Sequence, residues 1–516
     1  MKKATKFFSG ALAALMAFSA LTACDFGGGD SEVNMDIDLN QKIDLNVLMP
    51  SSGRDISAVN ADPNALRIEE LTGYDVQYYQ LPGSDASTSL RNDLTARAPY
   101  HAMKLTSAQF ADQIAEEMLL PLDEVLDKFG PEIKRVISDG SWDVVTVDGK
   151  IYGIPEKASS DNIENPIIFN KFILNELNLS VPMTKEELKT VLQTIKTQKG
   201  ITPLTFDKNQ TLIYPISAAF GIYSEWQEYT IDGQTEVRFY MDAPGYTDYV
   251  DYMHDLFSSG LIKQDVQDKD ASKALQEFGS GQAAALATSL WSVGSVVNIM
   301  EENALISEQD TLAPDGVPNA LSYLRSLENA DGEEKVYRTS GYTYIMAIPF
   351  YMAENAGYVI DWINSKLTDT DEAHNFRESV IGEEGVHWTY TARDGYQPLM
   401  ENFDEMNTAD YYLTGSNEEV YTEYWKARIR KTPEMYRAWD ELMTDADEVG
   451  VYNVADALPP ITEYSKNRSY IEQYAQRQFY LMMRDGTGSF SELLAHFKAN
   501  GGTTATNAIN NWYLNK

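Results

Sequence analysis

The residue types that carry out most protein chemistry are unevenly represented in this sequence. Aspartate and glutamate number 78, whereas there are five histidines and one cysteine. A glycosidase needs two carboxylates held at a set distance, and in so acidic a chain a neighbouring pair such as Glu383 and Glu384 does not identify one. No histidine shows the H-E-x-x-H spacing of a zinc site; the histidines are His101, His254, His374, His387 and His496. The sequence therefore gives no support for catalysis by a metal ion or a nucleophile.

A short acidic loop comes nearest to a metal site. Residues 207–211 read Asp-Lys-Asn-Gln-Thr and offer side-chain oxygens at alternating positions. The loop lacks the glycine and the distal glutamate of the twelve-residue calcium loop. We predict no metal and no cofactor, with a structural calcium ion at this loop as the lesser alternative.

The single cysteine, Cys24, lies directly behind a short apolar segment. Three lysines stand among the first six residues, and residues 10–21 are almost wholly apolar. This run is shorter than the roughly 20 residues of a spanning helix, so we interpret residues 1–23 as a secretion signal. Residues 21–24 read Leu-Thr-Ala-Cys and resemble the lipobox of bacterial lipoproteins. The resemblance implies a diacylglycerol on the Cys24 sulfur and cleavage before it, and two acyl chains suffice for stable anchoring.

The chain is strongly acidic. Its formal charge is −37, and removing residues 1–23 takes away three lysines and no acid, which makes it −40. Such a surface repels nucleic acid and anionic lipid headgroups. We therefore expect no nucleic-acid partner and a body held off the membrane by a small, polar tether over residues 24–39.

Strand and helix patterns alternate in the first part of the chain. Residues 42–49 and 74–79 are typical of strands, and residues 64–71 and 108–118 are typical of helices. This order predicts a parallel α/β sheet, in which ligands bind at the carboxyl ends of the strands. The candidate ligand positions there are Ser51, Ser52, Arg54, Asp55, Thr106 and Ser107.

The next segment carries two sharp local signals. Asp148-Gly149 predicts a tight hairpin turn between two short strands. Residues 167–171 are typical of a further strand, followed by a helix over 171–177. Thr184 with Glu187 predicts a capping box at the start of a helix that ends near Lys199.

This succession resembles the extracellular solute-binding proteins of bacterial ABC importers. More narrowly, it resembles family 1, the large carbohydrate-binding lipoproteins of Gram-positive bacteria. The order and spacing of the matching stretches carry the resemblance across nearly the whole chain after Cys24. They are residues 147–155, 168–171, 181–184 with Glu187 and Leu188, 278–283, 341–342, 360–363, 382–388 and 507–514.

The resemblance implies a two-lobe α/β fold of the periplasmic-binding-protein type (class II), with a ligand cleft between lobes joined by hinge segments. The first lobe would take residues 40–157 plus 336–395, and the second residues 158–335 plus 396–516. Closure around the ligand would then be a hinge motion of two rigid bodies.

A sugar presents a flat C–H face and a rim of hydroxyls, so we look for aromatic rings and polar side chains near the cleft. The alternative is packing for each ring and a solvated surface pair for Glu156 with Lys157. We interpret Trp362, Trp425, Trp439 and Trp512 as packing residues. The predicted ligand-binding residues are Arg54, Asp55, Ser107, Glu156, Lys157, Asn170, Trp226, Trp291, Tyr342, Trp388 and Tyr390.

The resemblance implies a lipid-anchored, monomeric receptor that captures an oligosaccharide outside a Gram-positive cell and presents it to ABC permease subunits without covalent chemistry. Three alternatives stay open. The ligand could be a peptide or another nutrient, since a fold does not name its ligand. The protein could be an anchored glycan-degrading enzyme, or an adhesion or scaffold protein without a small ligand.

Overall fold

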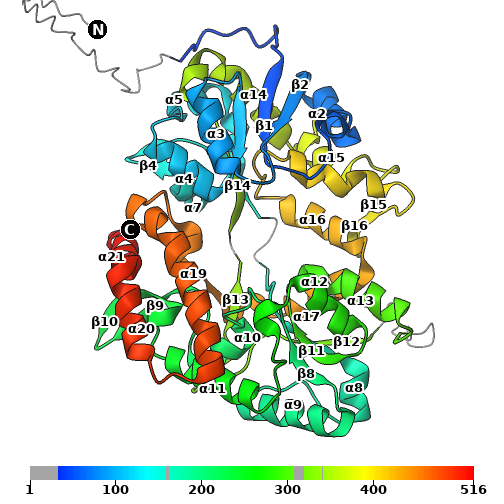
Figure 1. Ribbon diagram of the computed structural model, residues 1–516. Coiled ribbons are helices and arrows are strands. Elements are labelled where there is room, and N and C mark those ends of the chain that lie inside the picture. Colours follow the sequence, from blue (N-terminus) through cyan, green and yellow to red (C-terminus); the bar gives the residue numbers. More distant parts are fainter. Residues whose placement is uncertain (1–32, 159–161, 307–318, 340) are drawn as a thin grey trace, which may run out of the picture.

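The structure is a computed structural model of two α/β lobes, stacked one above the other in Figure 1. It describes residues 33–158, 162–306, 319–339 and 341–516, so the expected signal segment and Cys24 lie outside the described residues. The predicted two-lobe α/β fold is confirmed. Within the described ranges, no helix combines the length and the apolar character needed to cross a bilayer.

The first lobe is built on a five-stranded sheet with the strand order β2-β1-β3-β14-β6. Its strands are β1 (Leu45–Met49), β2 (Val76–Gln80), β3 (Ala102–Leu105), β6 (Ile154–Lys157) and β14 (Tyr342–Ala347). β1 pairs in parallel with β2 and β3, whereas β14 runs antiparallel between β3 and β6. The carboxyl ends of β1, β2 and β3 therefore form one edge, which we call the carboxyl edge.

Helices and two hairpins surround this sheet. The first set of helices is α1 (Ile56–Asn60), α2 (Pro63–Thr72), α3 (Ala86–Thr95), α4 (Ser107–Ala115), α5 (Asp123–Phe129), α6 (Pro131–Val136) and α7 (Asp139–Trp142). Later in the chain come α14 (Ala356–Leu367), α15 (Asn375–Ile381), the 3-10 helix η8 (Phe403–Tyr412) and α16 (Tyr421–Arg430). The hairpins are β4 (Thr146–Val147) with β5 (Lys150–Ile151), and β15 (Trp388–Thr391) with β16 (Gly395–Pro398).

The second lobe has a four-stranded sheet with the order β12-β7-β11-β8. These strands are β7 (Ile167–Asn170), β8 (Thr202–Thr205), β11 (Ala283–Ala287) and β12 (Leu321–Leu324). β11 is parallel to β8 and antiparallel to β7. Two strand pairs lie outside this sheet: β9 (Trp226–Ile231) with β10 (Gln234–Phe239), and β13 (Val336–Arg338) with β17 (Gly450–Tyr452).

The helices of the second lobe come from two separate parts of the chain. The first part gives α8 (Lys171–Glu176), α9 (Lys185–Lys199), α10 (Tyr214–Ser217), α11 (Tyr246–Ser258), α12 (Ala271–Gly279) and α13 (Val293–Glu302). The second part gives α17 (Pro433–Leu442), α18 (Ala446–Val449), α19 (Thr462–Asp485), α20 (Phe490–Phe497) and α21 (Thr503–Tyr513).

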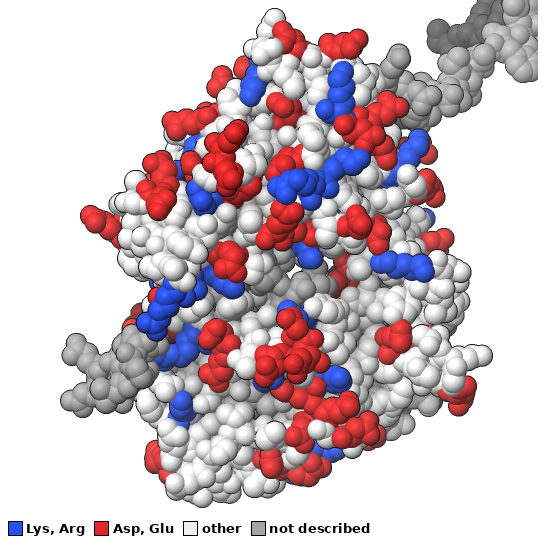
Figure 2. Space-filling view, turned by 180° about the vertical axis from the view of Figure 1, so that it is seen from behind, with Lys and Arg blue, Asp and Glu red and all other residues white. Residues whose placement is uncertain are grey.

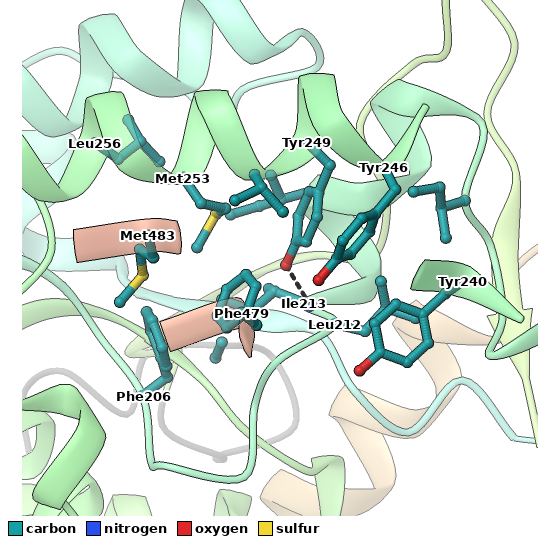
Figure 3. Packing of buried hydrophobic residues seen from close by; sticks show 14 of the residues in the cluster. Phe206, Leu212, Ile213, Tyr240, Tyr246, Tyr249, Met253, Leu256, Phe479 and Met483 are labelled. Carbon is teal, nitrogen blue, oxygen red and sulfur yellow. Dashed lines mark hydrogen bonds between the residues drawn. The ribbon is translucent and has the colours of Figure 1, made fainter. Parts of the chain in front are cut away.

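The largest hydrophobic core fills the second lobe between α11 and α19. Figure 3 shows Tyr249, Met253 and Leu256 of α11 turned toward Phe479 and Met483 of α19. The Tyr249 hydroxyl accepts a hydrogen bond from the Ile213 amide at 3.1 Å, so this buried ring has a partner for its polar end. The long helix α19 is thus part of the second lobe's core.

Two lobe boundaries differ from the expected ones. Phe403, Tyr412 and Tyr424 belong to the core cluster of the first lobe, which continues to Ala427, because η8 and α16 pack on α2 and α15. Residues 396–427, which we expected in the second lobe, therefore lie on the first. Conversely, residues 336–338, expected in the first lobe, pair with β17 of the second.

The described part of the expected tether also differs from the prediction. Met35, Ile37 and Leu39 pack against the core of the first lobe. A Cβ atom on Gly357 would lie 2.5 Å from the Ile37 side chain, which shows how closely this segment approaches α14. Residues 33–39 are therefore held on the first lobe by apolar contact.

The two local signals are confirmed. Asp148 and Gly149 both have positive φ, at 50° and 77°, and join β4 to β5 as a tight turn. Thr184 and Glu187 form the reciprocal hydrogen bonds of a capping box at the start of α9.

Candidate ligand-binding site between the lobes

In the part of the chain that the structure describes, three connections lead from one lobe to the other. The first crossing follows β6 and leads to β7, the second joins β13 to β14, and the third joins α16 to α17. Figure 1 shows these segments between the upper and lower lobes. A ligand bound beside these crossings would contact both lobes. The relative orientation of the lobes can change through rotations in the few residues of the crossings.

A cavity of about 650 Å³ lies at this level, and we call it the interlobe cavity. Its volume is within the usual range for small-molecule sites. Figure 2 shows the molecule hollowed between its lobes, with acidic and basic side chains around the hollow. The lining comes from both lobes and includes Arg135, Lys157, Arg338, Glu418, Trp439 and Asp447.

The charged groups of the interlobe cavity are already paired. Arg338 lies 2.6 Å from Asp447, and Lys157 lies 3.7 Å from Glu418. The Trp439 indole N–H donates to the Asn162 side-chain oxygen at 2.8 Å. These ion pairs and hydrogen bonds hold the donor and acceptor groups of the cavity in place. A neutral polar ligand could bind to them without having to neutralise an unpaired charge.

The carboxyl edge of the first lobe carries a second polar group of residues. The Arg54 guanidinium donates to Asp62 at 2.6 Å and to the Tyr412 hydroxyl at 3.2 Å. The Tyr411 hydroxyl donates to the Pro50 carbonyl and accepts from Gln80, both at 2.8 Å. The half-buried Tyr411 ring is thereby fixed at the strand ends.

Asp55 and Ser107 also lie at the carboxyl edge, as expected, and both are exposed. Asp55 precedes α1 without capping it through its side chain, and Ser107 is the first residue of α4. The structure therefore brings Arg54, Asp55 and Ser107 to the same edge of the sheet and leaves their contact with a ligand as a prediction.

Glu156 is buried, which corrects both expectations for it, as a ligand contact and as a surface group. Its carboxylate lies 2.8 Å from the ammonium group of Lys104. Burial raises the pKa of Glu156 to about 7, and Lys104 acts in the opposite direction. Its neighbour Lys157 has the opposite orientation and lines the interlobe cavity.

Asn170 serves as a helix cap, which corrects its assignment as a ligand contact. Its side-chain oxygen accepts from the Phe172 and Ile173 amides at 3.0 and 3.2 Å, at the start of α8. The side chain is buried, and its oxygen already accepts from two helix N–H groups.

Trp226 and Trp388 are packing residues, which also corrects the prediction. Trp226 is the first residue of β9, pairs with Phe239 and is fully buried. Asp232 and Gly233, both with positive φ, are the hairpin signal that could have shown this. The Trp388 indole donates to the Gly382 carbonyl at 2.7 Å inside the first lobe.

The other three aromatic candidates are at least partly exposed to solvent. Trp291 is half-buried and meets Trp425 edge to face at 5.3 Å between ring centroids, so a ring from each lobe touches at the third crossing. The Tyr342 hydroxyl is 3.3 Å from the Ser141 hydroxyl. Tyr390 is 55% exposed and lies outside the interlobe cavity.

A stacked pair of tyrosines in the second lobe was not predicted from the sequence. Tyr214 and Tyr337 stack at 4.2 Å at the upper side of the second lobe, where Figure 1 shows α10 and β13. Burial together with Glu472 and Asp456 raises the pKa of nearby Glu225 to about 7. The only signal for Tyr214 is its position before Pro215 at a helix start after β8; Tyr337 has none, because its place depends on pairing with β17.

The side-chain oxygens of the acidic loop over residues 207–211 have hydrogen-bond partners both within the loop and outside it. The Asp207 carboxylate accepts from the Asn209 amide at 2.7 Å. Among the residues that the structure describes, no three His, Cys, Asp or Glu side chains come together as a metal ion would require.

Comparison with known proteins adds a family and several relatives. A sequence model of the family described as "Bacterial extracellular solute-binding protein" matches residues 62–321. An uncharacterized protein in the butB 5′ region of Niallia circulans is 27% identical over 273 residues, which cover 52% of this chain and 99% of that protein. The fructooligosaccharide ABC transporter substrate-binding protein FusA of Streptococcus pneumoniae is 23% identical over 252 residues, which cover 42% of this chain and only 46% of the relative.

Solved structures of the same fold cover almost the whole chain. FusA of Streptococcus pneumoniae in complex with kestose superposes with a TM-score of 0.64 at 16% identity, over 92% of this chain and 100% of that one. A solute-binding protein of Bifidobacterium longum infantis, described as binding HMO, gives a TM-score of 0.64 at 16% identity over 92% and 98% of the two chains. At this identity the likeness establishes the two-lobe fold.

Proposed function

The chain belongs to the bacterial extracellular solute-binding protein family, and we propose that it is a lipid-anchored receptor that captures an oligosaccharide between its two lobes and delivers it to an ABC permease. The interlobe cavity is the observation that carries this proposal, because its walls come from both lobes and lie beside the crossings. A ligand there favours one relative orientation of the lobes, and a permease that recognises that orientation receives the loaded protein.

The chemistry of the site favours a neutral sugar. Tyr421 and Trp439 supply the aromatic residues in the lining of the interlobe cavity, and its paired charges supply donors and acceptors for hydroxyl groups. FusA, which shares this fold, is described with kestose bound. We propose binding without covalent chemistry, by a monomer.

The proposed cellular location of the protein is based on the sequence around Cys24. A basic start, a short apolar run and Leu-Thr-Ala-Cys support a lipid anchor on the outer face of the membrane of a Gram-positive cell. With the boundaries observed above, we propose a first lobe that ends near residue 157 and resumes over residues 341–430, the rest forming the second.

Isothermal titration calorimetry of the protein from residue 33 onward tests the ligand class. We expect heat of binding with members of a neutral oligosaccharide panel and none with a mixture of peptides. A Lys157→Met variant should weaken sugar binding about tenfold or more, since a hydrogen bond to a charged group is lost. The matched control is Lys134→Met, a lysine on the surface of the same lobe that is paired with Asp127 and is expected to leave binding unchanged.

Other outcomes overturn the proposal. Binding of peptides alone would make the protein a peptide receptor. New reducing ends after incubation with polysaccharide would make it an enzyme. No thermal shift across a broad glycan panel would favour a scaffold without a small ligand.

A further inference from the structure

A second cavity adjoins the interlobe cavity on the side of α16 and α17. Its volume is about 590 Å³, and we call it the outer cavity. Lys426, Trp439 and Met443 line both cavities. Figure 1 shows the β15–β16 hairpin and α16 of the first lobe above α17 of the second, so the outer cavity, like the interlobe cavity, is bounded by both lobes.

Aromatic side chains line the outer cavity from both lobes. Tyr390 reaches it from β15 and is 55% exposed. Tyr436 comes from α17 and stacks on Trp439 with ring centroids 6.0 Å apart. Arg430 donates to the Tyr436 hydroxyl at 3.0 Å and to the Tyr396 carbonyl at 2.8 Å, which ties this ring to the hairpin.

The charge of the outer cavity differs from that of the molecule. Its lining holds three basic residues and three acidic ones, whereas the whole chain has 41 Lys and Arg against 78 Asp and Glu. A balanced lining neither repels an anion nor selects a cation, and it offers both donors and acceptors. Together with the tyrosine rings, this suits an uncharged polyhydroxylated chain. The six residues are Arg393, Lys426, Arg430, Asp394, Glu423 and Asp440.

We propose that the outer cavity binds the continuation of a carbohydrate chain whose other end lies between the lobes. The ligand class is then a neutral oligosaccharide that is too long for the interlobe cavity alone. This inference rests on the proposed function and adds to it a length requirement. Tyr390 becomes a specificity-determining residue for the distal sugar units, and Trp439 forms the shared wall over which the chain passes.

The experiment is a titration of the protein from residue 33 onward with length ladders of neutral oligosaccharides, prepared from inulin, amylose and xylan. With the ladder that binds, affinity should rise from the short to the long members. In the Tyr390→Ala variant this gain should fall by about threefold to tenfold, since a ring contact is lost, while short members bind as before. The matched control is Tyr470→Ala, an exposed tyrosine on α19 that is 42% accessible and remote from both cavities.

Each outcome separates the two proposals. Binding that does not depend on length, or a Tyr390→Ala variant that keeps the full gain, overturns the outer-cavity inference and leaves the receptor proposal intact. An equal loss at every length also overturns it, because Tyr390 would then act on the whole site. If no ladder member binds the unmodified protein, the carbohydrate receptor itself is wrong.

Discussion

The ammonium group of Lys104 on β3 lies 2.8 Å from the carboxylate of Glu156 on β6, with β14 between the two strands. The same ammonium group donates to the carbonyl groups of Tyr411 and Leu413 at 3.1 and 2.8 Å. This buried pair thus ties the strand of the first crossing to the segment that carries Tyr411 at the carboxyl edge.

Replacing Lys104 should be costly. A Lys104→Met variant leaves Glu156 buried without its partner and leaves the carbonyl groups of Asp410, Tyr411 and Leu413 without this donor, so we expect a loss of about 3–5 kcal/mol in the free energy of unfolding. Urea denaturation followed by circular dichroism measures it.

The matched comparison is Lys134→Met, which breaks the exposed pair with Asp127 and should cost about 0–1 kcal/mol. A double variant, Lys104→Met with Glu156→Leu, should recover part of the loss because the Glu156 carboxyl group is no longer buried without Lys104. If Lys104→Met and Lys134→Met lost the same free energy of unfolding, a structural role for the buried pair would be contradicted.

The stability of the second lobe should depend on the protonation of Glu225. Its pKa is raised from an ordinary value near 4.5 to about 7 by burial and by the nearby Glu472 and Asp456, while Arg468 acts in the opposite direction. The folded state therefore holds this proton more tightly than the unfolded chain, which stabilises the fold fully below about pH 4.5. That contribution is lost as the pH rises through about 7.

Unfolding free energies of the wild type and of Glu225→Gln, measured between pH 4.5 and 8, test this. The wild-type value minus the variant value should decrease by about 1–3 kcal/mol across the window. Parallel curves would show that Glu225 does not titrate there.

Asn170 provides a test of structural against ligand-binding roles. Asn170→Ala removes the acceptor for two helix N–H groups of α8 and should cost about 1 kcal/mol of stability, whereas Asn170→Asp keeps an oxygen in place and should cost less. Calorimetry with a bound sugar should give the same affinity for all three proteins. A loss of affinity at unchanged stability would restore the ligand role.

The anchor is tested at one atom. Cys24→Ser removes the sulfur that would carry the diacylglycerol, so the protein should move from the membrane fraction to the culture medium when expressed in a Gram-positive host. Immunoblots of the two fractions read this out. Retention in the membrane fraction would contradict lipidation, and conversion of Ala23 to Gly, another small residue, should leave the anchoring unchanged.

Signals that span a few residues could be predicted from the sequence. Thr184 and Glu187 specify their capping box within one helical turn, and Asp148-Gly149 specifies a hairpin through its positive φ angles. The alternation that predicted strands and helices near the start of the chain appears as β1, α2, β2 and α4. These elements depend on backbone preferences that neighbouring residues decide.

The site residues depend on contacts between distant segments, and here the prediction was weaker. Whether Glu156 faces solvent or Lys104 is decided only when β14 pairs with both β3 and β6. Tyr411 reaches the carboxyl edge through a hydrogen bond to Pro50, far away in the chain. A pattern of types and spacing carries no information about such contacts, so Glu156 and Asn170 were assigned to a ligand while Lys104 and Tyr411 were missed.

The place of β14 in the sheet has a consequence for how the protein is made. Ribosomes deliver the chain from its N-terminus, and β7, β8, β11 and β12 are all synthesised before residues 342–347. Until then β3 and β6 lack the strand that joins them, and their unpaired edges can recruit strands of other chains. The first lobe, whose synthesis starts first, therefore completes its sheet after the second lobe. During synthesis, the strands of the first lobe must be protected from aggregation for the longest time.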